Sequence, residues 1–274
     1  MRAWRLAGAA AAPLAAEGPL AAGLWDAGAT AVWIDGDDLV GYYGDEAAAV
    51  PPGDGRWEPV AELDHVAAYL AGLAPVDAGA VVVAPTHCEA VVRAGQQVVW
   101  LDPGTAFGTG HHASTRLALE ALGRLPLAGR RVLDVGAGSG LLAIAADRLG
   151  AADAVGLDID ADTVPVARAN ADLNRSRARF VVGGFGDVTL DPCDVLLANL
   201  YAELHAAWLG AYAAIVAVGG DLLLSGILDP RDRLVRAALA ELDVAAGATG
   251  SPRLALVEER RDGDWWLLHL RREA

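Results

Sequence analysis

The sequence predicts a doubly wound α/β domain, with helices on both faces of a mostly parallel sheet, preceded by a small α+β unit. Three observations support this prediction. From residue 131 onward, short apolar runs alternate with helical patterns, the order typical of a parallel sheet. A glycine-rich turn at residues 136–140 joins the first of these runs to a helix. Residues 253–270 carry the pattern of an antiparallel hairpin.

The first 58 residues favour a small unit of strands and one helix. Residues 3–6 favour a strand, and residues 14–25 carry a broken helical pattern. Two apolar runs, 31–34 and 39–43, flank an Asp-Gly-Asp-Asp sequence that is typical of a hairpin.

A cluster of Pro, Gly and Asp at residues 51–55 marks the edge of this unit. Residues 60–73 favour a short helix that could tether two domains. We therefore expect an N-terminal domain at 1–58, a linker helix at 59–74 and a catalytic domain at 75–274.

In the catalytic domain, β-type runs at 81–83 and 98–101 lead to a glycine-rich loop and a helix at 114–122. Strands and helices alternate after that. Strands are expected at 131–135, 154–158, 179–182, 194–198 and 221–225, and in a final hairpin at 253–260 and 265–270. Helices are expected near 139–149, 161–174, 202–217 and 230–242.

Composition narrows the class of protein. Hydrophobic residues make up 54% of the chain, so a sizeable core is expected, but no apolar run approaches the roughly 20 residues of a membrane span. The start of the chain does not resemble a secretory signal, and Cys88 and Cys193 have no metal-ligand spacing. We therefore expect a cytoplasmic protein with two ordinary thiols.

The net charge of −15 argues against DNA or RNA as the main partner, because phosphate binding needs a basic surface. Such a field would attract a basic protein, although acidity also serves solubility alone. All 21 basic residues are arginine, so the chain has no lysine of its own to modify.

The glycine turn points to an adenosine cofactor. Gly136 and Gly138 let the backbone approach a ligand closely, and Asp158 closes the next strand, where its carboxylate can accept both ribose hydroxyls. The spacing is Gly-x-Gly-x-Gly, whereas dinucleotide sites favour Gly-x-Gly-x-x-Gly. Asp134 lies just before the turn, and a carboxylate there repels a pyrophosphate but suits an ammonium and a sulfonium. The pattern therefore favours S-adenosylmethionine over NAD.

Two further segments favour a second half of the site. A loop rich in glycine and hydroxyl groups, residues 107–116, precedes a helix at which Ser114 or Thr115 could be mere capping residues. His111 and His112 have no third ligand at a telling spacing, so we expect no metal. Asn199 follows an apolar strand, the position at which ligands bind in open α/β sheets. The Asn-Pro-Pro-Tyr sequence of many base and amide methyltransferases is missing there, which disfavours a planar acceptor.

These residues together resemble the signature of the ribosomal protein L-eleven (L11) methyltransferase family. The similarity covers roughly residues 95–245. It lies in segments 102–104, 108–111, 115–116, 132–136, 156–160, 198–205 and 225–228. The linker departs from the family, whose members often carry Trp and Lys there.

The resemblance implies a ferredoxin-like N-terminal domain that grips the ribosomal protein, a linker helix, and a seven-stranded Rossmann-like class I methyltransferase domain. It implies methyl transfer to lysine side chains and to the N-terminal amine of that protein. The cofactor contacts that it implies are Thr115, Gly136, Gly138, Asp158, Asn199 and Phe107. The same resemblance places Asn199, Leu200 and Tyr201 at the acceptor side.

No residue is required as a base, because the acceptor amine could lose its proton to solvent before docking. Glu203, His111 and His112 are candidates for assisting it. The competing hypotheses are a methyltransferase of the same fold with another acceptor, a module that binds S-adenosylmethionine without turnover, and an NAD oxidoreductase. We expect a monomer, with no direct contact to nucleic acid or membrane.

Overall fold

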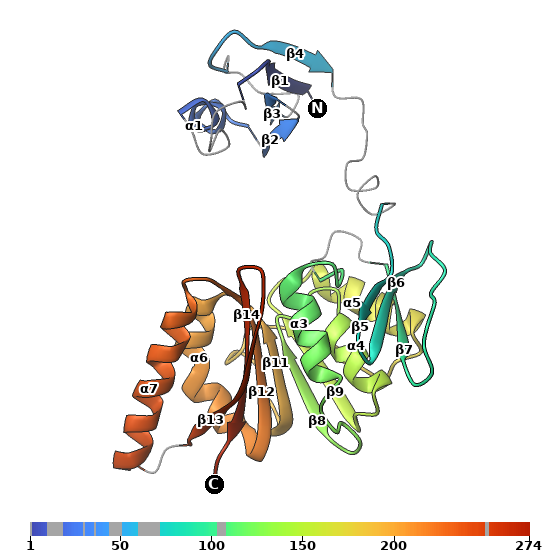
Figure 1. Cartoon of the computed structure of the whole chain (residues 1–274), viewed down its shortest axis with the longest axis vertical. Helices are drawn as coiled ribbons and strands as arrows, with labels where there is room; N and C mark the ends of the chain where they lie inside the picture. The colour runs from blue at the N-terminus through green and yellow to red at the C-terminus, as the bar shows by residue number, and fades with distance from the viewer. Residues whose placement is uncertain are drawn as a thin grey trace. The chain divides into compact units, whose positions relative to one another are not determined.

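The structure is a computed structural model of the whole chain, shown in Figure 1. The described residues are 2–9, 19–29, 31–35, 37–43, 51–59, 72–102, 108–249 and 252–274. Contacts divide the chain into a unit of residues 1–69 and a unit of residues 70–274. The predicted linker helix lies mostly outside the described residues, as does Phe107.

The N-terminal unit is a four-stranded antiparallel sheet with one described helix. Its strands lie in the order β2-β3-β1-β4, and both β2 and β1 run antiparallel to β3. This arrangement is the split β-α-β of ferredoxin-like domains. The predicted hairpin is confirmed, and β4 is an additional strand that directly follows the predicted breaker cluster at 51–55. Its elements are β1 (Arg2–Leu6), α1 (Pro19–Asp26), β2 (Ala31–Asp35), β3 (Asp38–Tyr43) and β4 (Arg56–Pro59).

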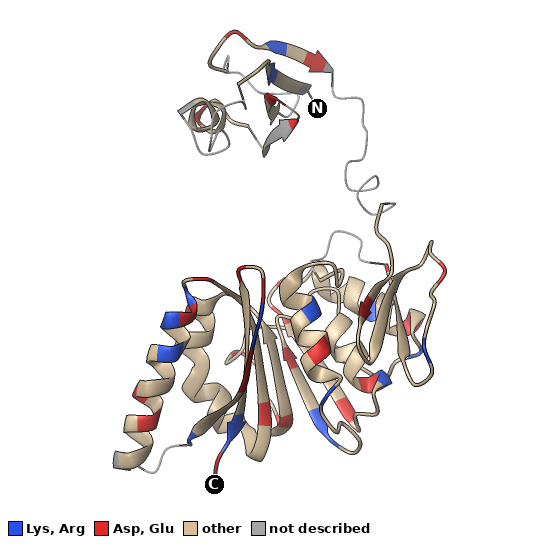
Figure 2. Cartoon of the chain, viewed as in Figure 1, with Lys and Arg blue, Asp and Glu red and all other residues tan. Residues whose placement is uncertain are grey.

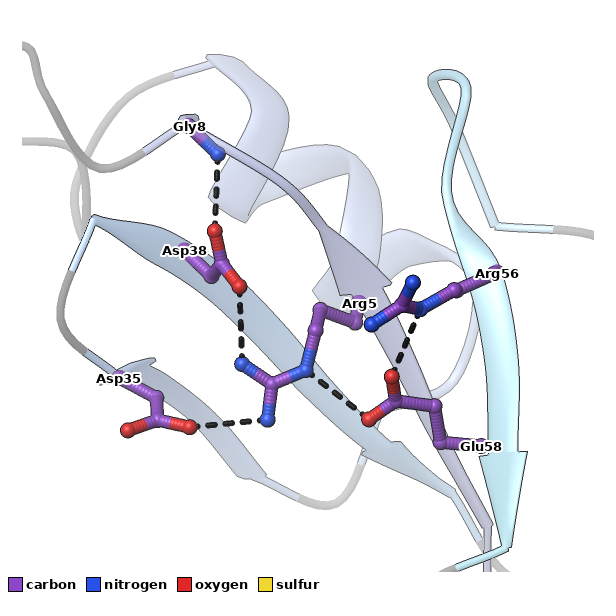
Figure 3. Close-up of polar contacts among 6 residues, drawn as sticks. All are labelled: Arg5, Gly8, Asp35, Asp38, Arg56 and Glu58. Carbon is purple, nitrogen blue, oxygen red and sulfur yellow. Dashed lines mark hydrogen bonds and ion pairs between the residues drawn. The ribbon is translucent and has the colours of Figure 1, made fainter.

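One arginine joins all four strands of this sheet. The guanidinium of Arg5 on β1 contacts Asp35 at 2.8 Å, Asp38 at 3.0 Å and Glu58 at 2.9 Å (Figure 3). Arg56 donates a second hydrogen bond to Glu58. Because the carboxylates come from β2, β3 and β4, the cluster ties the two edge strands to the centre of the sheet. On the other side, Trp4, Leu6, Ala21, Leu24, Leu39 and Tyr43 form a small core.

The second unit begins with a small three-stranded sheet. Its strands are β5 (Val76–Ala78), β6 (Val81–Pro85) and β7 (Gln97–Leu101), in the order β5-β6-β7. The structure confirms the two predicted strands, β6 and β7. Strand β5 was not predicted, because a strand of three residues carries too short a pattern. Asn174 fixes β7 from a helix 74 residues away, because its side chain accepts from the Trp100 N–H at 2.7 Å and donates to the Trp100 carbonyl at 2.6 Å.

The main sheet has seven strands in the order β10-β9-β8-β11-β12-β14-β13. The first five in this order are parallel, and β14 runs antiparallel to both β12 and β13. The predicted parallel sheet with a terminal hairpin is confirmed. The strands are β8 (Arg131–Val135), β9 (Asp153–Asp158), β10 (Arg179–Val182), β11 (Cys193–Asn199), β12 (Val216–Leu228), β13 (Leu254–Asp262) and β14 (Trp265–Arg272).

Helices cover both faces of this sheet (Figure 1). One face carries α3 (Ala113–Leu122), α4 (Leu141–Arg148) and α5 (Thr163–Leu173), and the other carries α6 (Ala202–Ile215) and α7 (Asp232–Thr249). Helix α4 is buried over 141–146 because nearly every residue there is Ala, Leu or Ile, so it packs on the sheet and on its neighbouring helices. None of the described helices has the length and apolar character needed to cross a bilayer.

Charges on this unit are mixed. Acidic and basic residues are interspersed along α7 and the strand ends, whereas α6 carries only Glu203 (Figure 2). Asp221 on β12 is fully buried and pairs with Arg130, His269 and Arg271. Burial raises the pKa of this carboxyl group, but the three hydrogen bonds outweigh it and hold the pKa well below its usual range.

Candidate functional site

The glycine turn lies between β8 and α4. Gly136, Gly138 and Gly140 all have positive φ, at +74°, +52° and +82°, where L side chains are strained. A Cβ on Gly136 would lie 2.6 Å from Leu200 Cδ2, so a larger residue would also displace the end of the Leu200 side chain. The backbone N–H groups of Gly136 and Ala137 both donate to the Leu157 carbonyl of β9, which holds the turn close to the neighbouring strand.

Asp158 ends β9 directly beside this turn. One carboxylate oxygen accepts from the Gly138 N–H at 2.9 Å and the other from the Asp160 N–H at 3.0 Å. Each oxygen has a second lone pair, so the carboxylate is oriented by the backbone while it can still accept from a ligand hydroxyl. The predicted pair of glycine turn and acidic residue therefore lies together.

Asp134 lies behind the turn rather than on the pocket wall. Its side chain is fully buried, and one oxygen accepts from the Ala143 N–H of α4 at 3.1 Å. The helix begins after Gly140, which has no side chain to cap it, so this carboxylate supplies the acceptor. Burial, with a smaller contribution from the nearby charge of Asp158, raises the pKa of Asp134 to about 7 against the opposing effect of the Ala143 hydrogen bond.

The other half of the site is the turn after β11. Asn199 ends the strand, and its side-chain amide donates to Thr115 Oγ1 of α3 at 3.1 Å. Thr115 is 1% exposed, so it is more than a capping residue. Tyr201 follows with 73% of its surface exposed. Gly226 of β12 packs against this turn, since a Cβ there would lie 2.5 Å from the Leu200 carbonyl oxygen.

Both halves open into one cavity of about 440 Å³, within the range of small-molecule sites. Of the residues expected at the site, Gly136, Gly138, Asp158, Asn199, Leu200 and Tyr201 line it. Thr115 contacts the pocket indirectly through Asn199. Glycines and a carboxylate at one side, with an apolar wall nearby, fit an adenosine, so the donor set matches the expected S-adenosylmethionine.

Sequence reasoning missed a large part of the apolar wall. Gly183 and Gly184 follow β10, where the parallel-strand rule could have found them. Leu204 and Trp208 lie on α6, three and seven residues after Tyr201, and share its helix face. Trp265 comes from β14, and no local signal links it to this site. The additional lining residues are Ser114, Val135, Leu157, Ile159, Gly183, Gly184, Phe185, Leu204, Trp208, Gly226 and Trp265.

The candidate assisting residues contact other groups or have a lowered pKa. His111 contacts the Ala74 carbonyl at 2.7 Å, and Glu203 forms an ion pair with Arg231; neither lines the cavity. His112 does line it and caps α3. Burial and, to a lesser degree, Arg116 lower the pKa of His112. Over the described residues, no three His, Cys, Asp or Glu side chains are grouped as metal ligands.

Hydrogen bonds connect the glycine turn to residues 102 and 108. Ser139 of the turn donates to the Gly108 carbonyl at 2.8 Å, and its own carbonyl accepts from Asn170 of α5 at 2.9 Å. The Asn170 side chain also accepts from the Asp102 N–H at 2.9 Å. Residues 102 and 108, which flank the segment 103–107, are therefore both held against the glycine turn.

Comparison with known proteins gives a consistent answer. Residues 34–272 match the model of the family described as ribosomal protein L11 methyltransferase. The chain is 46% identical over 260 residues to the enzyme of that name from Deinococcus radiodurans, covering 91% of this chain and 93% of the other. It is 42% identical over 252 residues to the one from Thermus thermophilus, with the same coverage.

A solved structure agrees with the sequence match. The ribosomal protein L11 methylase from Lactobacillus delbrueckii subsp. bulgaricus superposes with a TM-score of 0.65 at 28% identity. The match covers 74% of this chain and all of that one.

Proposed function

Because the chain belongs to the ribosomal protein L11 methyltransferase family, we propose that it transfers methyl groups from S-adenosylmethionine to amines of ribosomal protein L11. The acceptors are lysine side chains and the N-terminal amine. One observation carries the proposal: the adenosine side, at Gly136, Gly138 and Asp158, and the amine side, at Asn199 and Tyr201, open into a single cavity. A module that only held the cofactor would not need the second half.

We propose that Asp158 accepts the ribose hydroxyls and that Gly136 and Gly138 admit the methionine portion. Asn199 borders the reacting end and is held there by Thr115, while Phe107 contributes from the loop before α3. When bound, S-adenosylmethionine supplies an electrophilic methyl group on a sulfonium. The protein's contribution is to position the amine in line with that group and to exclude water.

The acceptor amine must be neutral to react. Lowering a lysine pKa from about 10.4 to about 7.5 corresponds to about 4 kcal/mol, a shift that desolvation alone can supply. The wall of Leu200, Tyr201 and Trp265 supplies an apolar surface for this. We propose that the amine loses its proton to solvent before docking and that no side chain acts as a dedicated base.

The no-base proposal is tested by pH–rate profiles of His111→Ala and His112→Ala. We expect each variant to keep the ionisation of the wild-type profile, because it belongs to the acceptor amine. Loss of an ionisation together with a large fall in turnover would refute the proposal.

Charge, location, oligomeric state and domain roles complete the proposed function. The net charge of −15 favours a basic protein as partner and disfavours nucleic acid. We propose that the chain acts as a cytoplasmic monomer. We also propose that residues 1–58 form a substrate-recognition domain, that residues 59–74 form the linker, and that residues 75–274 are catalytic.

The function is tested by mass spectrometry of L11 after incubation with enzyme and S-adenosylmethionine. We expect 14 Da increments at lysines or at the N-terminus. Asp158→Asn should abolish them by weakening cofactor binding. Asp153→Asn, at the opposite end of the same strand, should not. Methylation of another protein or of a small molecule, but not of L11, would overturn the substrate assignment and favour a same-fold enzyme with a different acceptor.

A further inference from the structure

The turn that borders the amine side is held from behind by a buried polar contact. The Ser225 carbonyl of β12 accepts two hydrogen bonds, one from the Leu200 N–H at 3.1 Å and one from His205 Nε2 at 2.7 Å. The Ser225 hydroxyl donates to the Ser114 carbonyl at 2.8 Å. Three separate segments, the start of α3, the end of β11 and the first turn of α6, therefore meet at one serine.

Packing alone does not explain a histidine at position 205. His205 is 0% exposed, and its ring lies with its centroid 6.4 Å from that of the buried Tyr212 of α6. Burial lowers its pKa to about 4, against the opposing effect of the Ser225 and Leu200 backbones, so the ring is neutral. A buried imidazole costs desolvation that a leucine would avoid.

The hydrogen bond also fixes the state of the ring. A carbonyl can only accept, so Nε2 carries the proton and Nδ1 is the unprotonated nitrogen. Nδ1 has no hydrogen-bond partner among the residues that the structure describes. The ring therefore keeps its bond to Ser225 through Nε2 although Nδ1 is buried without a partner.

The hydrogen bond from His205 Nε2 to the Ser225 carbonyl fixes the Asn199–Tyr201 turn, because both Leu200 and Tyr201 are bonded to one of its two partners. The Leu200 N–H shares the Ser225 carbonyl, and the His205 backbone N–H donates to the Tyr201 carbonyl at 3.2 Å. Gly226, the next residue of β12, leaves no space for the turn to retreat, because the Leu200 carbonyl and Asn199 Oδ1 pack on it. The side chain of Asn199 is held separately by Thr115.

We propose that His205 is a positioning residue that fixes the Asn199–Tyr201 turn, through Ser225, at the distance from the cofactor that methyl transfer requires. This inference rests on the proposed function, since it assigns the turn to the acceptor side. His205 touches neither cofactor nor acceptor: it does not line the cavity. Its loss should lower the rate of transfer and leave cofactor binding, which rests on Asp158 and the glycine turn, nearly unchanged.

Two substitutions of His205 separate positioning from packing. His205→Gln keeps an N–H near the place of Nε2, whereas His205→Leu preserves the apolar packing and removes the donor. We expect His205→Leu to lower kcat by about 10- to 100-fold, the cost of a displacement of about 1 Å. The Kd of S-adenosylmethionine and the KM of the acceptor should stay within about threefold. His205→Gln should recover most of kcat.

Hydrogen exchange of the Leu200 amide gives a readout that needs no acceptor. It should be faster in His205→Leu and close to wild type in His205→Gln, whichever amine the enzyme methylates. His269→Gln is the matched control: this histidine is also buried and bonded, at 2.8 Å to Asp221, but away from the cavity. It should leave kcat and the Leu200 exchange unchanged.

The proposal is overturned if folded His205→Leu keeps wild-type kcat, or if Leu200 exchange is the same in all variants. A wild-type enzyme that fails on L11 while the Leu200 exchange pattern holds would instead refute the substrate assignment alone.

Discussion

At the scale of single residues, the buried carboxyl group of Asp134 makes stability depend on pH. Its pKa is about 7 in the folded state and near 3.8 when unfolded, so folding favours the protonated form. The stability associated with this group is therefore full below pH 3.8 and is lost as pH rises toward 7. The shift of about 3 units corresponds to on the order of 4 kcal/mol.

We predict that Asp134→Asn gains stability relative to wild type as pH rises from 5 to 8, by a few kcal/mol. The Asn oxygen still accepts from Ala143, but the variant has no charge to bury. Urea unfolding at pH 5, 6.5 and 8 measures the difference. Asp147→Asn is the control. Burial raises the pKa of Asp147, but hydrogen bonds from Arg177 and Ser176 outweigh it and lower the pKa. The loss of unfolding free energy in this variant should therefore be constant over this range. A pH-independent effect of Asp134→Asn would contradict the prediction.

Gly226 carries a second residue-scale prediction. We expect Gly226→Ala to lower kcat by about 100-fold, because the new methyl group would push the Leu200 carbonyl, 2.5 Å away, out of place. Steady-state kinetics with a cofactor titration measures this. Gly219→Ala on the same strand is the control: its φ of +77° carries similar backbone strain, but no atom lies within 4 Å of the added Cβ. Equal losses in both variants would assign the effect to strain alone.

At the scale of elements, α5 connects the cofactor turn to the edge of the domain. Asn170 and Asn174 lie one turn apart on and just after this helix and bond β7 and the residue that follows it. Only Asn170 also reaches the glycine turn, through Ser139. Leaving such buried groups unpaired costs about 1–3 kcal/mol each.

We predict that Asn170→Ala and Asn174→Ala destabilise the protein similarly but that only Asn170→Ala weakens S-adenosylmethionine binding, by several-fold. Calorimetry gives the affinities and thermal unfolding the stabilities. If Asn174→Ala weakened binding to the same extent, α5 would act on the site through general stability and not through Ser139.

At the scale of the whole molecule, net charge decides how the enzyme meets its protein substrate. A charge of −15 attracts a basic protein. At physiological ionic strength, salt screens this attraction at distances beyond about 8 Å. We predict that kcat/KM for L11 falls about tenfold between 50 and 300 mM NaCl, mainly through KM. The Kd of S-adenosylmethionine, bound in a cavity, should change little. A salt-independent kcat/KM would exclude electrostatic steering.

Much of the architecture is local and was therefore predictable. Alternating apolar runs and helical patterns between residues 131 and 270 gave all seven strands of the main sheet, because a strand's burial pattern is carried by its own residues. The glycine spacing and Asp158 gave half of the site for the same reason. Strand β4 reads Arg-Trp-Glu-Pro, with one large apolar residue between charged ones, and β5 has only three residues, so neither carries such a pattern.

The tertiary structure alone decided what lies across the cavity. Trp265 is a hairpin residue that reaches the wall because β14 inserts between β12 and β13. Thr115 meets Asn199, 84 residues later, and His205 meets Ser225. Likewise, Asp134 was expected near the ligand, yet it faces α4. By itself the sequence determined the elements and the cofactor turn, because these depend on neighbours along the chain. Asn199, Leu200 and Tyr201 were also expected at the site, whereas their partners across the cavity depend on strand order and packing, which no local pattern encodes.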